Sequence, residues 1–97
     1  MSKPSATPVF CEREAVIRNA EGLHFRPIMQ LVAIASQYQS AVRVHHNDRS
    51  ADGRSPMELL MLIATQGSKL RLTAEGEDAD AALTALTELV ESGFGEA

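Results

Sequence analysis

The 97-residue sequence contains only one cysteine, few aromatic residues with no tryptophan among them, and no long apolar run. Each of these scarcities argues against a class of protein or site. A single Cys excludes an internal disulfide and a metal cage built from several cysteines. The apolar runs are too short to form a membrane-spanning helix. Aromatic residues make up only 4% of the chain, which leaves few side chains on which nucleic-acid bases could stack.

Positive charge is also scarce, since 9 Lys and Arg stand against 13 Asp and Glu and give a formal net charge of −4. A nucleic-acid-binding domain normally carries a basic stripe, so we do not expect such a partner. Residues 1–50 hold six basic and four acidic side chains, whereas residues 51–97 hold three and nine. The small positive excess therefore lies in the first half of the chain.

The length and composition predict one small domain. Residues 1–12 begin with two of the four prolines and indicate a flexible leader, residues 13–92 form the domain, and residues 93–97 form a short tail. The first residues lack the basic and then apolar order of a signal peptide. We therefore expect a cytoplasmic monomer that does not insert into a membrane.

Hydrophobic periodicity predicts the element order β-α-β-β-α-β-α. Alternation of apolar and polar residues predicts strands near 13–18, 41–44, 49–51 and 69–74. Apolar spacings of three and four residues predict helices after His24, over 57–64 and after Asp78. Strands with one polar face imply an antiparallel sheet that carries helices on its other face. We expect an α+β fold, a two-layer open-faced sandwich with a four-stranded sheet, although a ferredoxin-like domain fits the pattern almost as well.

Two of the helices have capping residues at their predicted starts. Ser55, Pro56 and Glu58 have the spacing of a capping box. In that motif the Ser55 hydroxyl accepts from the N–H of Glu58, and the Glu58 carboxylate accepts from the N–H of Ser55. Asp78 is expected to cap the last helix, and Gly93 is expected to end it.

The segment Gly22-Leu23-His24-Phe25-Arg26-Pro27 places a histidine and a cation at the start of the first helix. Unpaired N–H groups and the positive end of the helix dipole favour an anion there. Arg26 adds a guanidinium that binds phosphate oxygens. Histidine, cation and helix N-terminus together describe a site at which a phosphoryl group could be carried on an imidazole nitrogen. Spacing alone leaves open a surface histidine beside a solvated arginine.

This hexapeptide resembles the active-site signature of the HPr-type histidine phosphocarriers of the bacterial phosphoenolpyruvate phosphotransferase system. Residues 54–62 resemble the second signature of the family, a basic residue and a Ser that open a short apolar helix. Residues 73–78 resemble its Ala-Glu-Gly-Glu-Asp run. The likeness extends from about Arg13 to Val90 with the same element order, and residues 91–94 are similar to the nitrogen-related branch.

The resemblance implies a phosphoryl carrier without independent turnover, cofactor or metal. His24 would receive phosphate on Nδ1 from enzyme I and pass it to an enzyme II or a nitrogen-branch acceptor, and Arg26 would stabilise the phosphoryl group. Ser55 matches the position that some members offer to a regulatory serine kinase. The alternatives are a regulatory docking module of the same fold with little phosphate exchange, and an unrelated small-molecule sensor.

Some residues depart from the family pattern. Phe25 stands where Ala or Thr is usual, and Ile28 and Met29 replace small residues. We expect Phe25 to be exposed and to contact the partner, because aromatic side chains dominate interface energies. Pro56 follows Ser55 where Ile or Leu is usual, so we expect Ser55 to act mainly as a helix cap.

Five further residues invite a functional interpretation. Met57, Leu60 and Met61 lie close together on the second predicted helix and form either a partner-facing surface or part of the core. His45 and His46 are adjacent on a strand and point to opposite faces, which disfavours a shared metal ion. We expect both histidines on the hairpin surface.

Overall fold

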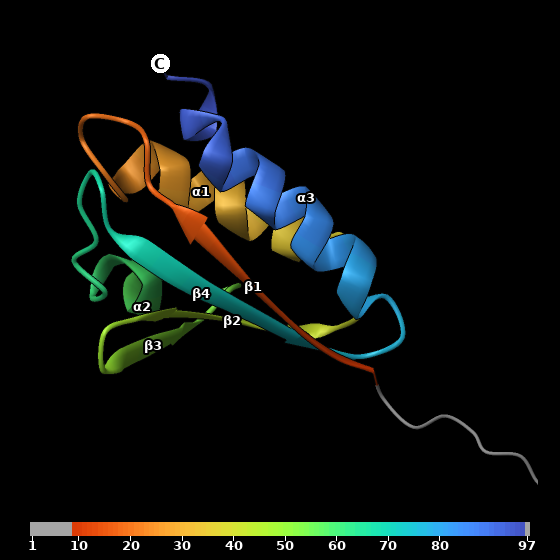
Figure 1. Cartoon of the computed structure of the whole chain (residues 1–97). Helices are drawn as coiled ribbons and strands as arrows, with labels where there is room; N and C mark the ends of the chain where they lie inside the picture. Colours follow the sequence, from red (N-terminus) through yellow and green to blue (C-terminus); the bar gives the residue numbers. More distant parts are fainter. Residues whose placement is uncertain (1–8, 97) are drawn as a thin grey trace, which may run out of the picture.

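In the computed structural model, residues 9–96 are described, and they form a sheet covered by helices on one face (Figure 1). Most of the predicted leader, residues 1–8, lies outside the described residues. The elements follow in the order β1 (Phe10–Val16), α1 (Phe25–Ala35), β2 (Ala41–His46), β3 (Arg49–Asp52), α2 (Pro56–Leu60), β4 (Lys69–Glu75), α3 (Ala79–Glu91) and the short 3₁₀ helix η1 (Gly93–Gly95).

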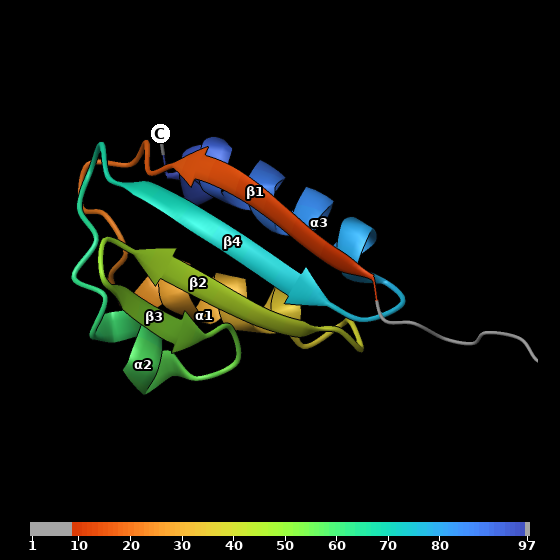
Figure 2. The same cartoon turned by 60° about the horizontal axis from the view of Figure 1, so that its bottom comes forward.

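The four strands form one antiparallel sheet in the order β1-β4-β2-β3. Figure 2 shows the strands side by side, with α1 and α3 behind them. The predicted α+β open-faced sandwich is confirmed. Within residues 9–96, no helix has both the length and the hydropathy needed to cross a membrane.

A single apolar core lies between the sheet and the two long helices. Alternate strand residues such as Val44 and Leu72 are fully buried, and they belong to one cluster with Leu31 of α1 and Leu86 of α3. Phe94, which the sequence analysis placed in the tail, is 1% exposed and belongs to the same core. The folded unit therefore includes η1.

Two predicted boundaries were wrong. β1 begins at Phe10, inside the predicted leader, because Phe10, Cys11 and Glu12 continue the pairing with β4. α2 ends at Leu60, well before the predicted Ala64. Met61 and Leu62 form a turn after the helix, and the positive φ of Ile63, 51°, lies outside the right-handed helical region.

Asp78 does not cap α3 with its side chain. Its carboxylate accepts instead from the backbone N–H groups of Gln39 (2.8 Å) and Ser40 (2.9 Å), and from the Ser40 hydroxyl. Asp78 therefore joins the start of α3 to the loop between α1 and β2. These hydrogen bonds lower the pKa of Asp78, with that of the Ser40 hydroxyl contributing most.

Candidate functional site

His24 is the N-cap residue of α1 and has an extended backbone. The preceding Gly22 has a φ of 71°, and a Cβ there would lie 2.6 Å from the carbonyl oxygen of Ala64. Leu23 donates its N–H to that same carbonyl at 3.0 Å. The loop before α1 is thus fixed against the segment before β4, and this contact holds His24 at the start of the helix.

The first turn of α1 offers unpaired N–H groups beside the imidazole. The N–H of Ile28 donates to the carbonyl of His24, but the N–H groups of Phe25 and Arg26 have no partner within residues 9–96. Pro27 has no N–H to offer, and the turn contains no acidic side chain. An anion next to His24 would therefore meet two free donors and the positive end of the helix dipole.

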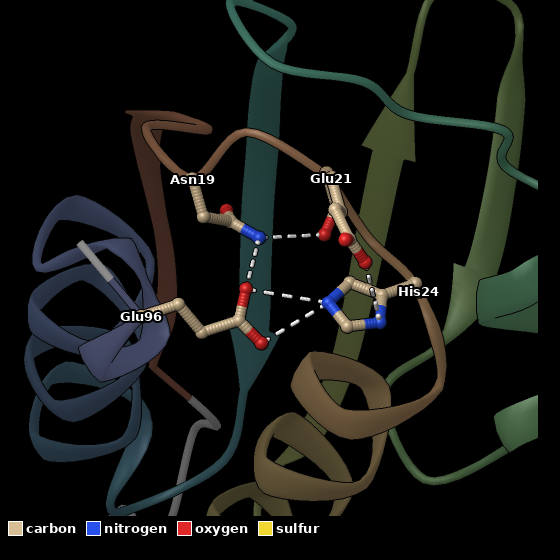
Figure 3. Close-up of polar contacts among 5 residues, drawn as sticks. Asn19, Glu21, His24 and Glu96 are labelled. Carbon is tan, nitrogen blue, oxygen red and sulfur yellow. Dashed lines mark hydrogen bonds and ion pairs between the residues drawn. The ribbon is translucent and has the colours of Figure 1, made fainter.

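Glu96 contacts His24 from the other end of the chain (Figure 3). Nε2 of His24 lies 3.0 Å from Oε2 and 3.3 Å from Oε1 of Glu96. The buried Asn19 donates its Nδ2 hydrogens to Oε1 of Glu96 at 3.0 Å and to the carbonyl of Gly22 at 2.8 Å. The hydrogen bond with His24 lowers the pKa of Glu96, with smaller contributions from Asn19 and from the charge of Arg26.

The other ring nitrogen of His24 faces a more open environment. Nδ1 lies 3.8 Å from Oε1 of Glu21, a side chain that is 77% exposed. The His24 side chain itself is 35% exposed, and Arg26 is exposed next to it. An open depression beside the ring is lined by Ala20, Glu21, His24, Arg26, Gly95 and Glu96. The structure therefore brings His24 and Arg26 together at a surface that another protein can reach.

The apolar residues singled out on α1 and α2 are exposed. Phe25 is 74% exposed and Met57 is 72% exposed, and Leu60 and Met61 are exposed as well. The interpretation of Met57, Leu60 and Met61 as part of the core is therefore wrong. α2 packs against α1, so these side chains lie on helices adjacent to the histidine.

Ser55 caps α2, and half of the predicted capping box is confirmed. Its Oγ accepts from the N–H of Glu58 at 3.3 Å. The return contact was predicted wrongly, because the Glu58 carboxylate accepts from the N–H of Asp52 at 2.8 Å. The N–H of Ser55 already donates to the carbonyl of Asp52 in the preceding turn and needs no second acceptor.

The neighbouring histidines of β2 have different partners. Nε2 of His45 lies 3.0 Å from the hydroxyl of Thr73, and Nδ1 of His46 donates to the carbonyl of Leu62 at 2.9 Å. Burial, and then the charges of Arg71 and Arg43, lower the pKa of His45. Neither side chain lines the depression beside His24.

Sequence reasoning missed Asn19, which follows the first predicted strand, and Glu96, which lies in the predicted tail. One local signal was present: Phe94 lies between Gly93 and Gly95, directly after the amphipathic last helix. Glycines on both sides favour a turn at this point, and a Phe there is a candidate for burial. Phe94 has a φ of 56°, Gly93 and Gly95 also have positive φ, and this turn directs Glu96 toward His24.

The chain matches known proteins over most of its length. Residues 11–92 match the family model described as PTS HPr component phosphorylation site. The phosphocarrier protein HPr of Pseudomonas aeruginosa is 44% identical over 84 residues, which cover 86% of this chain and 93% of that protein. The phosphocarrier protein NPr of Shewanella violacea is 37% identical over 86 residues, which cover 89% and 94%.

Larger proteins and solved structures are similar as well. The chain spans only 23% of the multiphosphoryl transfer protein of Salmonella typhimurium, to which it is 42% identical over 86 residues, or 86% of this chain. The crystal structure of HPr-C-His from Thermoanaerobacter tengcongensis superposes with a TM-score of 0.86 at 37% identity, covering 90% of this chain and 98% of the other.

Proposed function

The chain belongs to the HPr family of phosphocarrier proteins of the phosphotransferase system, and we propose that it carries the phosphoryl group on His24. The observation that supports this most strongly is the position of the ring. His24 is a partly exposed N-cap residue beside the N–H groups of Phe25 and Arg26, which have no hydrogen-bond partner within residues 9–96.

In the proposed reaction, the lone pair on Nδ1 of His24 attacks the phosphorus atom of a phosphorylated donor protein. The bond between nitrogen and phosphorus forms, and the bond between phosphorus and the donor breaks, leaving its electron pair on the donor. The N–H groups of the first turn and the guanidinium of Arg26 stabilise the charge on the phosphoryl oxygens. Glu21 is highly exposed, so its carboxylate has room to move away from the incoming anion.

The partners follow from the same proposal. Enzyme I of the phosphotransferase system is the donor, and an enzyme II or a nitrogen-branch protein is the acceptor, in the cytoplasm. The exposed Phe25, Met57, Leu60 and Met61 form the contact surface for these proteins. The chain has no independent turnover in this scheme, because it gains and loses the phosphoryl group only by exchange with a donor protein and an acceptor protein. Ser55 serves as a helix cap and not as the main site of regulation.

A two-step transfer experiment distinguishes a carrier from a docking module. The protein is incubated with enzyme I and labelled phosphoenolpyruvate, separated from the donor, and mixed with an acceptor protein. A carrier acquires an acid-labile, base-stable label and then loses it to the acceptor. Absence of label, or an acid-stable serine ester, would overturn the proposal.

A further inference from the structure

We propose that Glu96 is a positioning residue that holds the imidazole proton of His24 on Nε2 and so directs the phosphoryl group to Nδ1. The inference rests on the proposed function, in which His24 accepts the group. Beyond that function, Glu96 would determine which of the two ring nitrogens of His24 reacts.

The contact itself fixes the direction of the hydrogen bond. An ionised carboxylate only accepts, so Nε2 must be the donor when it lies 3.0 Å from Oε2 of Glu96. The lowered pKa of Glu96 keeps that carboxylate ionised at neutral pH. A neutral imidazole carries one N–H, and a proton on Nε2 leaves the lone pair on Nδ1. The nucleophilic nitrogen is thereby chosen before the donor protein arrives.

Glu96 is held more firmly than the acid on the other side of the ring. Its side chain is 19% exposed, and Oε1 accepts from the amide of Asn19, which is 2% exposed. Glu21 faces Nδ1 at 3.8 Å, beyond hydrogen-bonding distance, and is 77% exposed. The two carboxylates favour opposite tautomers. Because only Glu96 makes a hydrogen bond and is fixed by a buried partner, the tautomer with the proton on Nε2 is favoured.

The segment from η1 to Glu96 holds this carboxylate in place. The buried ring of Phe94 anchors η1 in the core, and the N–H of Glu96 donates to the carbonyl of Gly93 at 2.9 Å. The backbone before Glu96 is therefore a closed turn fixed to the core. Its side chain is fixed separately by Asn19.

The negative charge of the Glu96 carboxylate also stabilises the positive charge that phosphorylation creates on the imidazole ring. When the bond between Nδ1 and phosphorus forms, Nε2 keeps its proton and the ring gains a positive charge shared by both nitrogens. Glu96 already faces that charge, so it stabilises the phosphorylated ring without rearrangement. Attack through Nε2 would require a proton shift and loss of the contact with Glu96.

The test compares three variants. Glu96→Ala removes both the acceptor and its charge, Glu96→Gln keeps a neutral acceptor, and Glu21→Gln removes the charge of the acid near Nδ1. The first measurement is the ¹⁵N spectrum of the His24 ring in the unphosphorylated protein, in alkaline solution where imidazole is neutral. We expect the Nε2–H tautomer in the wild type, Glu96→Gln and Glu21→Gln, and a tautomer mixture in Glu96→Ala.

The second measurement is the rate and position of phosphorylation by enzyme I and phosphoenolpyruvate. For histidines that bind a metal, loss of the carboxylate on the other ring nitrogen lowers affinity or activity by about 10- to 100-fold. By analogy, and because His24 is partly exposed, we expect about a tenfold slower reaction at Nδ1 in Glu96→Ala. Glu96→Gln should lie between Glu96→Ala and the wild type, because it keeps the tautomer but loses the charge.

The two proposals fail in distinguishable ways. An Nδ1–H tautomer in the wild type, or the wild-type tautomer and rate in Glu96→Ala, would overturn the role of Glu96 and leave the carrier function intact. A wild-type protein that takes no phosphoryl group on His24 would overturn the carrier function. The tautomer measurement would then still report whether Glu96 positions the ring, since it needs no donor.

Discussion

Nε2 of His24 lies 3.0 Å from Oε2 of Glu96, although the two residues are 72 positions apart in the sequence. They meet because α1 begins and α3 ends at the same end of the molecule (Figure 1). The candidate site is thus assembled from a loop near the start of the domain and a turn near its end. Each part depends on the core for its position.

The first prediction concerns the anchor of that turn. Phe94→Ala removes a ring that is 1% exposed, and loss of a buried Phe costs about 3–5 kcal/mol of unfolding free energy. Urea unfolding should show this loss, while Phe25→Ala, a change at a 74% exposed ring, should leave the unfolding free energy nearly unchanged. A loss for Phe94→Ala as small as that expected for Phe25→Ala would contradict the placement of η1 in the core.

Phe25 should affect binding more than folding. An exposed aromatic ring next to the reacting histidine has the properties of an interface anchor, and truncation of such a residue costs at least about 2 kcal/mol of binding free energy. Titration calorimetry with enzyme I should show this loss for Phe25→Ala. A lowered melting temperature together with unchanged affinity would contradict the role of Phe25 as a contact residue.

Ser55 should behave as a helix cap. Loss of an N-cap hydroxyl costs about 0.5–2 kcal/mol, and the distance of 3.3 Å to the N–H of Glu58 favours the lower part of that range. Urea unfolding of Ser55→Ala measures this loss. Intact-mass analysis of protein from its native cells measures serine phosphorylation. A stoichiometric phosphoserine at Ser55, with no loss of stability in Ser55→Ala, would reverse the assignment.

The stability of the protein should decrease in acid. Hydrogen bonds from Ser40 and Gln39 lower the pKa of Asp78, and those from Val16 and Arg18 lower the pKa of Glu91. The unfolded chain, with carboxyl pKa values of about 4, therefore binds more protons than the folded chain. The contribution of these carboxylates is complete above those unfolded values and is lost as the pH falls through the lower, folded values.

Urea unfolding between neutral and strongly acidic pH measures this dependence, with Asp78→Asn as the comparison. The variant should be less stable at neutral pH and should lose less stability on acidification, because one shifted group is gone. Parallel curves for the variant and the wild type would show that Asp78 does not contribute to the acid sensitivity.

The sequence predicted those features that depend on neighbouring residues. Alternation located the strands, and the hexapeptide around His24 located the start of α1, because both are local patterns. The Ser55 hydroxyl was also placed correctly. The Glu58 carboxylate was placed wrongly. It accepts from the N–H of Asp52 in the turn before α2, and the spacing of the capping motif does not reveal this alternative donor.

The remaining errors involve contacts between distant segments. Asp78 has the spacing of a helix cap, but its carboxylate accepts instead from the N–H groups of Gln39 and Ser40 in a distant loop. The sequence pattern places Glu96 in a polar tail. In the structure, the buried Phe94 holds the preceding turn against the core, and Glu96 contacts His24. Periodicity within one segment contains no information about which segment lies opposite.

The carrier role of His24 is tested by locating the site of phosphorylation. Wild-type protein, His24→Ala, His45→Ala and His46→Ala are each incubated with enzyme I and labelled phosphoenolpyruvate, and the acid-labile label on the chain is counted. The proposed role of His24 predicts full labelling of the wild type and of the His45 and His46 variants, and no label on His24→Ala. Full labelling of His24→Ala would contradict it.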